Sequence, residues 1–215
     1  VDSESELAEL GITRLQLANG TQLYLKPTDF KDDEVLFSLY SPGGLSVVAD
    51  ADVVAAALAP LIVSQSGVAD FTLSDLDRLL AGKNVGLSPY LGDLEEGFSG
   101  SASPQDLETL FQLLYLYARQ PRADAEAFTN FQRQVEDYLA NRALAPETAL
   151  EDRYNELFCG DDPRCNVISI YEQVGAIDLS RALELYTERF GDLDGATILM
   201  AGAFDVETVK QLAQT

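Results

Sequence analysis

Histidine is missing from this sequence, and its absence limits the chemistry that the chain could perform. None of the 215 residues is histidine. A Ser-His-Asp or Cys-His nucleophile needs an imidazole as its general base, so neither arrangement can form. A serine–lysine pair remains formally possible, but no motif selects one. We therefore predict that the chain contains no catalytic residue.

The two cysteines, Cys159 and Cys165, flank the sequence Gly-Asp-Asp-Pro-Arg, which can fold the chain back on itself. A local disulfide and a reduced pair are both compatible with this spacing. A loop this short would stabilise the fold only modestly. A zinc site would need further ligands beside two thiolates, and no imidazole is available. The sequence therefore predicts no metal site and no cofactor site in this chain.

Two short motifs have the residue types of known sites but not their spacing. Glu95-Glu96 could suggest paired-carboxylate catalysis or calcium binding, but adjacent acids point in different directions and lack EF-hand spacing. We interpret them as exposed loop charge. Gly43-Gly44 is not followed by Gly-Lys-Ser/Thr, so we predict a tight turn with unusual φ angles rather than a phosphate-binding loop.

Composition indicates a soluble, globular and strongly acidic protein. Thirty-six acidic and 14 basic residues give a formal charge of -22, and 47% of the residues are hydrophobic. Such a charge repels nucleic acid and anionic lipid surfaces, so neither is an expected partner. The longest apolar run, Val53 to Val63, is interrupted by Pro60 and is shorter than a membrane helix requires. We expect no membrane insertion.

Hydrophobic patterning predicts strands at both ends of the chain. Alternating residues at 13–17 and 21–26 surround Asn19-Gly20, the strongest short hairpin signal, and a third strand is expected at 34–40. Residues 84–103 indicate a strand or a hairpin bent at Gly92-Asp93, and 196–204 indicate an apolar strand. We interpret residues 1–11 as an acidic leader or frayed helical turn, and 12–215 as a single domain.

Helices are predicted between these strands, at 50–66, from Thr72 or Ser74 to Leu80, at 105–120, from Asp124 onward, at 146–157, at 178–190 and after Asp205. Hairpins replace the βαβ alternation of a parallel sheet. The fold class is therefore α+β, with one antiparallel sheet covered by helices mainly on one face.

Six segments spread over nearly the whole chain carry a family resemblance. They are Leu17-Ala-Asn-Gly-Thr-Gln-Leu, Lys26-Pro-Thr-Asp-Phe, Ser41-Pro-Gly-Gly-Leu-Ser, Ser66-Gly-Val, Phe111-Gln-Leu and Leu199-Met-Ala-Gly-Ala-Phe-Asp. In this order and spacing they resemble one repeat of the insulinase/pitrilysin zinc metallopeptidases, whose repeats share a processing-peptidase-like fold.

The resemblance implies where a zinc site would lie if this repeat carried one. The family's metal-binding repeat uses His-x-x-Glu-His on a helix and a glutamate from a later helix. Counting back from Gly67 places Leu58, Pro60, Leu61 and Ile62 over that motif, within a residue. The motif is therefore degenerate here. Glu136 or Asp137 would fall near the third ligand, and we assign them no metal role.

The resemblance also implies a function for the parent protein. The Lys26-Pro-Thr-Asp-Phe and Pro42-Gly-Gly features look most like the third of four repeats, at the start of the C-terminal half. Such a repeat would help to enclose a peptide-degrading chamber, with zinc held by the catalytic repeat of the parent. The alternative is a catalytically dead scaffold or binding protein of the same fold.

Partners and compartment follow from the same resemblance. The expected partners are other repeats of the same chain or a homologous subunit, and the peptide substrate of the parent. The beginning and end of the sequence suggest a fragment of a longer chain. The cysteine pair, the acidity and the likeness to bacterial four-repeat proteins favour the periplasm.

Overall fold

The computed structural model describes residues 1–142, 144, 146–160, 162 and 164–214. In this part of the chain, seven strands form one sheet with the order β1-β2-β3-β7-β4-β6-β5. The strands are β1 (Ser3–Leu7), β2 (Ile12–Gln16), β3 (Gln22–Pro27), β4 (Val35–Pro42), β5 (Val85–Leu91), β6 (Glu95–Ala102) and β7 (Thr197–Gly202).

The two predicted hairpins form as the turn chemistry requires. Strands β2 and β3 pair in an antiparallel manner on either side of Asn19-Gly20, and Gly20 has a positive φ of 85°. Strands β5 and β6 pair in the same way around the Gly92–Asp93 bend. Glycine is favoured at position 20 because it lacks the Cβ atom that makes a positive φ costly.

The α+β class is confirmed, although the sheet is mixed rather than wholly antiparallel. Strand β7 lies between β3 and β4, parallel to β3 and antiparallel to β4. The register pairs Leu23 of β3 with Ile198 of β7. A strand this far along the chain returns after several helices, so no hairpin turn constrains its direction.

Residues 3–7 differ from the expected leader or helical turn. They form β1, which pairs with β2 and places Ser5 opposite Arg14 at the edge of the sheet. All five residues of β1 are exposed. Their backbone groups still bond to β2, and an exposed strand of this kind carries little of the apolar signal by which strands are recognised.

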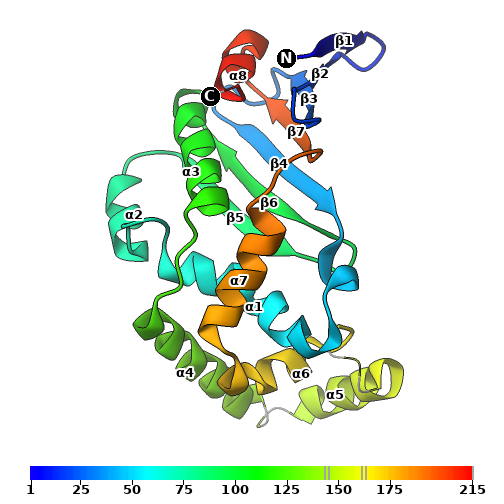
Figure 1. Cartoon of the computed structure of the whole chain (residues 1–215), viewed down its shortest axis with the longest axis vertical. Coiled ribbons are helices and arrows are strands. Elements are labelled where there is room, and N and C mark those ends of the chain that lie inside the picture. Colours follow the sequence, from blue (N-terminus) through cyan, green and yellow to red (C-terminus); the bar gives the residue numbers. More distant parts are fainter. Residues whose placement is uncertain (143, 145, 161, 163, 215) are drawn as a thin grey trace.

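The described helices are α1 (Val53–Ser66), α2 (Leu73–Leu79), α3 (Leu107–Arg119), α4 (Ala125–Arg142), α5 (Pro146–Cys159), α6 (Val167–Glu172), α7 (Leu179–Phe190) and α8 (Val206–Leu212). Figure 1 shows α4, α5 and α6 gathered at the end of the molecule away from both termini. The predicted helix starts are confirmed where a side chain caps the helix. Thr72, Asp178 and Asp205 each accept a hydrogen bond from a backbone N–H in the first turn of α2, α7 and α8, respectively.

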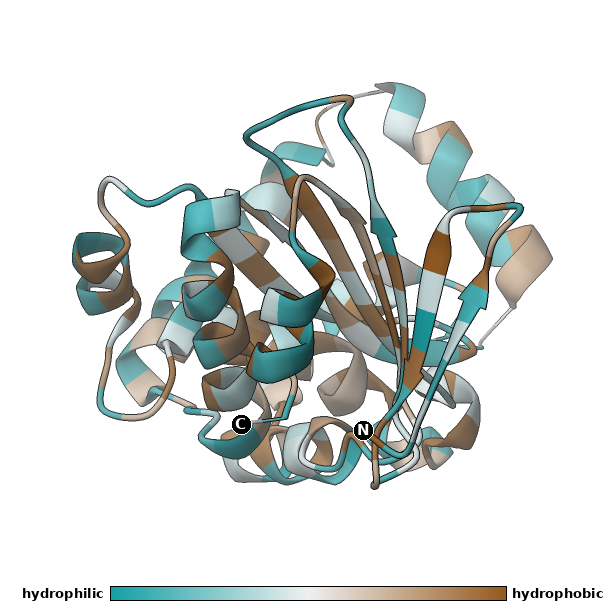
Figure 2. Ribbon diagram, turned by 90° about the horizontal axis from the view of Figure 1, so that it is seen from above, coloured by the Kyte–Doolittle hydropathy of each residue, from teal (hydrophilic) through white to brown (hydrophobic). Residues whose placement is uncertain are grey.

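The hydrophobic core lies between the sheet and the helices α1, α3 and α7. Along β4, Val35, Phe37 and Leu39 are buried, whereas Leu36 between them is 53% exposed. This alternation means that one face of the sheet meets the helices and the other remains open. Figure 2 shows the apolar residues concentrated on the central strands.

No helix among the described residues is both long and apolar enough to cross a membrane. The apolar helix α1 reaches only from Val53 to Ser66 and contains Pro60. Its apolar side chains pack inside the protein instead.

Candidate functional site

On α1, the side chains at the positions that the resemblance assigns to the zinc motif pack in the hydrophobic core. Leu58 is 4% exposed and Ile62 is 2% exposed, and both belong to the main core. Leu61 is half-buried and packs against the same core. Residues 58 and 62 are one turn apart on the same helix face, so the face that would hold two zinc ligands is filled by hydrocarbon.

No group of three or more histidine, cysteine, aspartate or glutamate side chains in the described residues is arranged to hold a metal ion. Glu136 and Asp137 are both exposed on α4. The absence of catalytic, metal and cofactor residues in this chain stays a prediction, which metal analysis can test.

A buried carboxylate occupies a position that we had interpreted as exposed loop charge. Glu96 lies on β6 and is 3% exposed, whereas its neighbour Glu95 is exposed as expected. Glu96 pairs with the guanidinium of Arg189 on α7, and the Gly44 backbone N–H donates to its other oxygen. The interpretation of Glu96 was therefore wrong, although the sequence contained a usable signal. Residues 96, 98 and 102 alternate on β6, and Phe98 and Ala102 face the core.

The prediction of a tight turn at Gly43-Gly44 is confirmed. Gly43 has φ 146° and Gly44 has φ 63°. A Cβ atom on Gly43 would collide with the Arg189 guanidinium, and a Cβ atom on Gly44 would collide with the Gly92 carbonyl. Gly43 therefore allows the backbone to lie against the Glu96–Arg189 ion pair, and Gly44 allows it to lie against the turn between β5 and β6.

The structure joins Cys159 to Cys165 by a disulfide. The bridge closes the loop that carries Arg164. The Arg164 guanidinium donates to the carbonyl oxygens of Leu45, at 3.2 Å, and Val48, at 2.7 Å. These contacts attach the loop to the segment between β4 and α1.

A third arginine holds the other end of that segment. Arg181 on α7 forms two hydrogen bonds with Asp52, at 2.8 and 3.2 Å. The hydrogen bonds from Arg181 hold the pKa of the Asp52 carboxyl below its ordinary value. Residues 43–52 are therefore held by Arg164 from the disulfide-closed loop and by Arg181 from α7, while Arg189, also on α7, acts through Glu96. Arg189 is committed to a buried partner, so this cluster supports the fold and is not arranged as a reaction centre.

The open face of the sheet offers a contact surface. Ile12, Tyr24, Leu36 and Leu199 line a shallow hollow of about 240 Å³ together with Lys26. Leu199 is 42% exposed, and Leu36 is more so. This combination of apolar and cationic side chains contrasts with the acidic composition of the chain.

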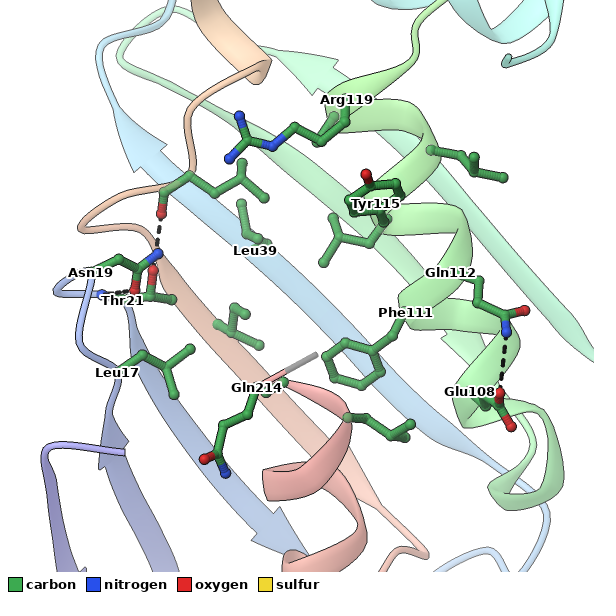
Figure 3. Close-up of a pocket in the computed structure, with 17 residues that line it drawn as sticks. Leu17, Asn19, Thr21, Leu39, Glu108, Phe111, Gln112, Tyr115, Arg119 and Gln214 are labelled. Carbon is green, nitrogen blue, oxygen red and sulfur yellow. Dashed lines mark hydrogen bonds between the residues drawn. The ribbon is translucent and has the colours of Figure 1, made fainter. Parts of the chain in front are cut away.

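A larger groove of about 950 Å³ runs between α3, the end of α8 and the turn before β3. Figure 3 shows Leu17 and Phe111 reaching into it from opposite sides. Polar groups at its margin bond to one another or to the backbone: Gln112 donates to Glu108 at 3.1 Å, and Thr21 donates to the Leu193 carbonyl at 3.0 Å. The lining of the groove is mainly apolar.

The aromatic residues of α3 and α4 include both buried and exposed side chains. Phe128 and Phe131 on α4 are each 7% exposed and belong to the core. Tyr115 on α3 is 57% exposed and lies along the groove. Helical spacing alone does not tell a buried aromatic residue from an exposed one, and the packed structure separates them.

Comparisons with known proteins find relatives that are named zinc proteases. No family model matches the chain. It is 28% identical over 206 residues to "Zinc protease PQQL-like" of Arabidopsis thaliana, covering 95% of this chain and 19% of that protein. It is 25% identical over 207 residues to "Probable zinc protease PqqL" of Haemophilus influenzae, covering 94% of this chain and 22% of that one. The chain thus spans about a fifth of the length of these curated relatives.

Solved structures share the fold. The periplasmic protease PqqL from Escherichia coli superposes with a TM-score of 0.80 at 22% identity, over 99% of this chain and 23% of the other. The peptidase M16 inactive domain from Pseudomonas fluorescens superposes with a TM-score of 0.76 at 14% identity, over 95% of this chain and 49% of the other. At these identities the likeness concerns the fold.

Proposed function

We propose that this chain, a repeat related to the insulinase/pitrilysin zinc metallopeptidases, is a non-catalytic structural repeat of a longer peptidase and helps to enclose its peptide-degrading chamber. One observation carries the proposal. The α1 positions that correspond to the zinc motif hold Leu58, Leu61 and Ile62, and at least two of these are core residues. A chain without histidine cannot supply the family's two imidazole ligands elsewhere.

The sizes of the relatives support a role as one repeat among several. Both curated relatives are named zinc proteases, and each is about five times as long as the segment that matches this chain. We place the zinc, and the residues that activate water on it, in a different repeat of the parent protein. Within the parent we assign this chain to the third of four repeats.

The open face of the sheet fits the wall of such a chamber. Leu36, Leu199 and Tyr24 provide an apolar surface, and Lys26 and Arg14 add positive charge beside it. The Arg14 guanidinium lies 5.7 Å from the centre of the Tyr24 ring. An unfolded peptide exposes both apolar and charged side chains, so a mixed surface of this kind can contact many sequences weakly.

We propose a periplasmic location for the parent protein. The Cys159–Cys165 disulfide requires an oxidising compartment to persist. The Escherichia coli structure that shares the fold is described as a periplasmic protease.

The test compares this chain with the longer protein that contains it. Each is purified, its zinc is measured by mass spectrometry, and cleavage of a quenched fluorescent peptide is followed with and without a chelator. We expect a metal-free, inactive chain and a zinc-loaded parent whose activity the chelator removes. If the parent is also inactive and metal-free, the scaffold alternative replaces this proposal. Stoichiometric zinc and peptide cleavage by this chain alone would refute both.

A matched pair of substitutions tests the packing role of α1. Leu58→Ala removes a buried side chain and should cost about 2–5 kcal/mol of unfolding free energy. Val47→Ala removes an apolar side chain that is 59% exposed. It should change the unfolding free energy by less than about 0.5 kcal/mol. Equal effects at the two positions would contradict the assignment of α1 to the core.

A further inference from the structure

Helix α5 presents its apolar side to solvent. Leu150, Tyr154, Leu157 and Phe158 are 75%, 57%, 68% and 71% exposed. Their spacing of four, three and one residues places all four within one side of the helix, because successive residues turn by about 100°. We call these four residues the α5 stripe.

The opposite side of α5 faces the protein and is polar. Thr148, Asn155 and Cys159 are its partly buried residues, and they lie about half a turn from the stripe. The Thr148 hydroxyl donates to the Arg142 carbonyl at 2.7 Å, and Cys159 forms the disulfide. Polar and covalent contacts therefore attach α5 to the rest of the protein. An ordinary surface helix turns its apolar side inward, whereas α5 turns its apolar side to solvent.

Salt bridges reinforce this orientation. Arg142 at the end of α4 contacts Asp152 at 2.6 Å and Glu151 at 3.3 Å. The Arg142 side chain is only 14% exposed. A rotation of α5 that buried the stripe would break these contacts, so the outward position of the stripe is built into the connection between α4 and α5.

Four large apolar side chains on one exposed helix face indicate a surface that is covered in the complete protein. Tyr154 and Phe158 already form a ring pair with centroids 4.3 Å apart. Such a preformed aromatic pair loses little side-chain freedom on binding, and aromatic residues are enriched at protein interfaces.

Charge favours a partner other than a second copy of this chain. Helix α5 carries four acidic residues, Glu147, Glu151, Asp152 and Glu156, and one basic residue, Arg153, which pairs with Glu156. The helix is therefore acidic overall, as is the whole chain with its formal charge of -22, and two copies would repel each other. A complementary partner has an apolar patch bordered by basic groups.

The relatives indicate where that partner lies in sequence. Matching segments make up only 19% and 22% of the two zinc proteases, so most of each protein consists of other parts. A partner in the same chain has a high effective concentration, so it can be held by a smaller surface than a separate molecule needs. We propose that the α5 stripe is the docking surface for a neighbouring repeat of the same longer protein, one that presents an apolar patch with a basic border. This inference rests on the proposed function, because it requires a parent with several repeats.

Hydrogen–deuterium exchange tests the docking on the longer protein and on this chain alone. We expect the amides of 147–159 to exchange at least about tenfold more slowly in the longer protein, because docking removes the stripe from water and suppresses local opening. The double substitution Leu157→Asp with Phe158→Asp should abolish that protection. The same substitutions should leave exchange in the isolated chain within about twofold, since both side chains are exposed there.

Phe30→Asp serves as the matched control, because Phe30 is 87% exposed and lies far from α5 in the sequence. It should leave the protection of α5 unchanged. Equal exchange of α5 in the longer protein and the isolated chain would overturn the proposal. So would a concentration-dependent dimer of the isolated chain that the double substitution dissolves, because the occupant would then be a second copy.

Peptidase activity, measured on the same samples, separates this proposal from the proposed function. Protection of α5 in an inactive, zinc-free parent would leave the docking surface intact and remove the peptidase role. An active parent whose α5 exchanges freely would retain the peptidase role and refute the docking surface.

Discussion

Replacing Glu96 by alanine should destabilise the protein strongly, although no reaction depends on this carboxylate. Its side chain is 4% exposed and that of its partner Arg189 is 27% exposed. Glu96→Ala leaves the guanidinium without its counter-charge and the Gly44 N–H without its acceptor. The Nε atom of Arg189 is buried without a hydrogen-bond partner among the described residues, so the guanidinium already lacks one acceptor before the carboxylate is removed.

The magnitude follows from the burial of the pair. Removing one partner of a buried ion pair costs about 3–5 kcal/mol, because the other charge stays in a poorly solvated site. Arg189 can reach some water, so we expect the lower end, about 3 kcal/mol. Glu96→Gln also removes the counter-charge and keeps one acceptor oxygen for the two donors, Gly44 and Arg189, so it should cost nearly as much. For a chain of this length, 3 kcal/mol corresponds to a fall in Tm of about 6–12 °C.

Urea unfolding followed by circular dichroism measures these differences, with Glu95→Ala as the control. Glu95 is the exposed neighbour on the same strand, and its replacement should change the unfolding free energy by less than about 0.5 kcal/mol. The double variant Glu96→Leu with Arg189→Met should lose less than the sum of the single variants, since it leaves no unpaired charge. If Glu96→Ala is as mild as Glu95→Ala, the buried ion pair does not stabilise the fold as we argue.

Three further predictions follow from other contacts. Reducing the Cys159–Cys165 bridge with a dithiol should lower the unfolding free energy by at most about 2 kcal/mol, the loop-entropy value for so short a loop; calorimetry with and without reductant measures it. Burial, with a smaller contribution from Glu95, raises the pKa of Tyr90 to about 12. Glu95→Gln should lower this pKa without restoring its ordinary value, as ring-carbon NMR would show. Asp124 accepts from the backbone N–H groups of Ala127 and Glu126 in the first turn of α4 and from the Arg122 guanidinium, and these bonds lower its pKa. Asp124→Ala should cost about 1 kcal/mol at neutral pH. In urea unfolding, the difference in unfolding free energy between the unsubstituted protein and Asp124→Ala should disappear as the pH falls through the pKa that Asp124 has in the folded protein. A carboxyl group whose pKa is lowered by folding stabilises the fold only while it is ionised.

Local signals predicted most of the elements correctly. The Asn19-Gly20 hairpin and the helix starts at Thr72, Asp178 and Asp205 depend on residues adjacent in sequence. The resemblance to one metallopeptidase repeat is also confirmed. The parallel pairing of β7 with β3 was missed, because strand order depends on contacts between segments that are far apart in the chain.

The environment of individual charges was harder to predict. Glu95 and Glu96 are the same residue type at adjacent positions, yet one is exposed and the other is buried against Arg189. The partner lies 93 residues away, on a helix. No local sequence pattern identifies Arg189 as the partner of Glu96. The alternation along β6 does indicate that Glu96 lies on the same face of the sheet as Phe98 and Ala102.

The sequence by itself determined that this chain has no imidazole, and therefore that it cannot build the family's zinc site, because composition alone decides which ligands exist. It also determined where most helices and turns begin, because capping and positive φ are local effects. Only the tertiary structure decided that Glu96 is buried and that α5 turns its apolar side outward. An amphipathic pattern shows that a helix has an apolar side, but the direction of that side depends on the contacts that anchor the helix. In α5 those anchors are Arg142 and the disulfide of Cys159.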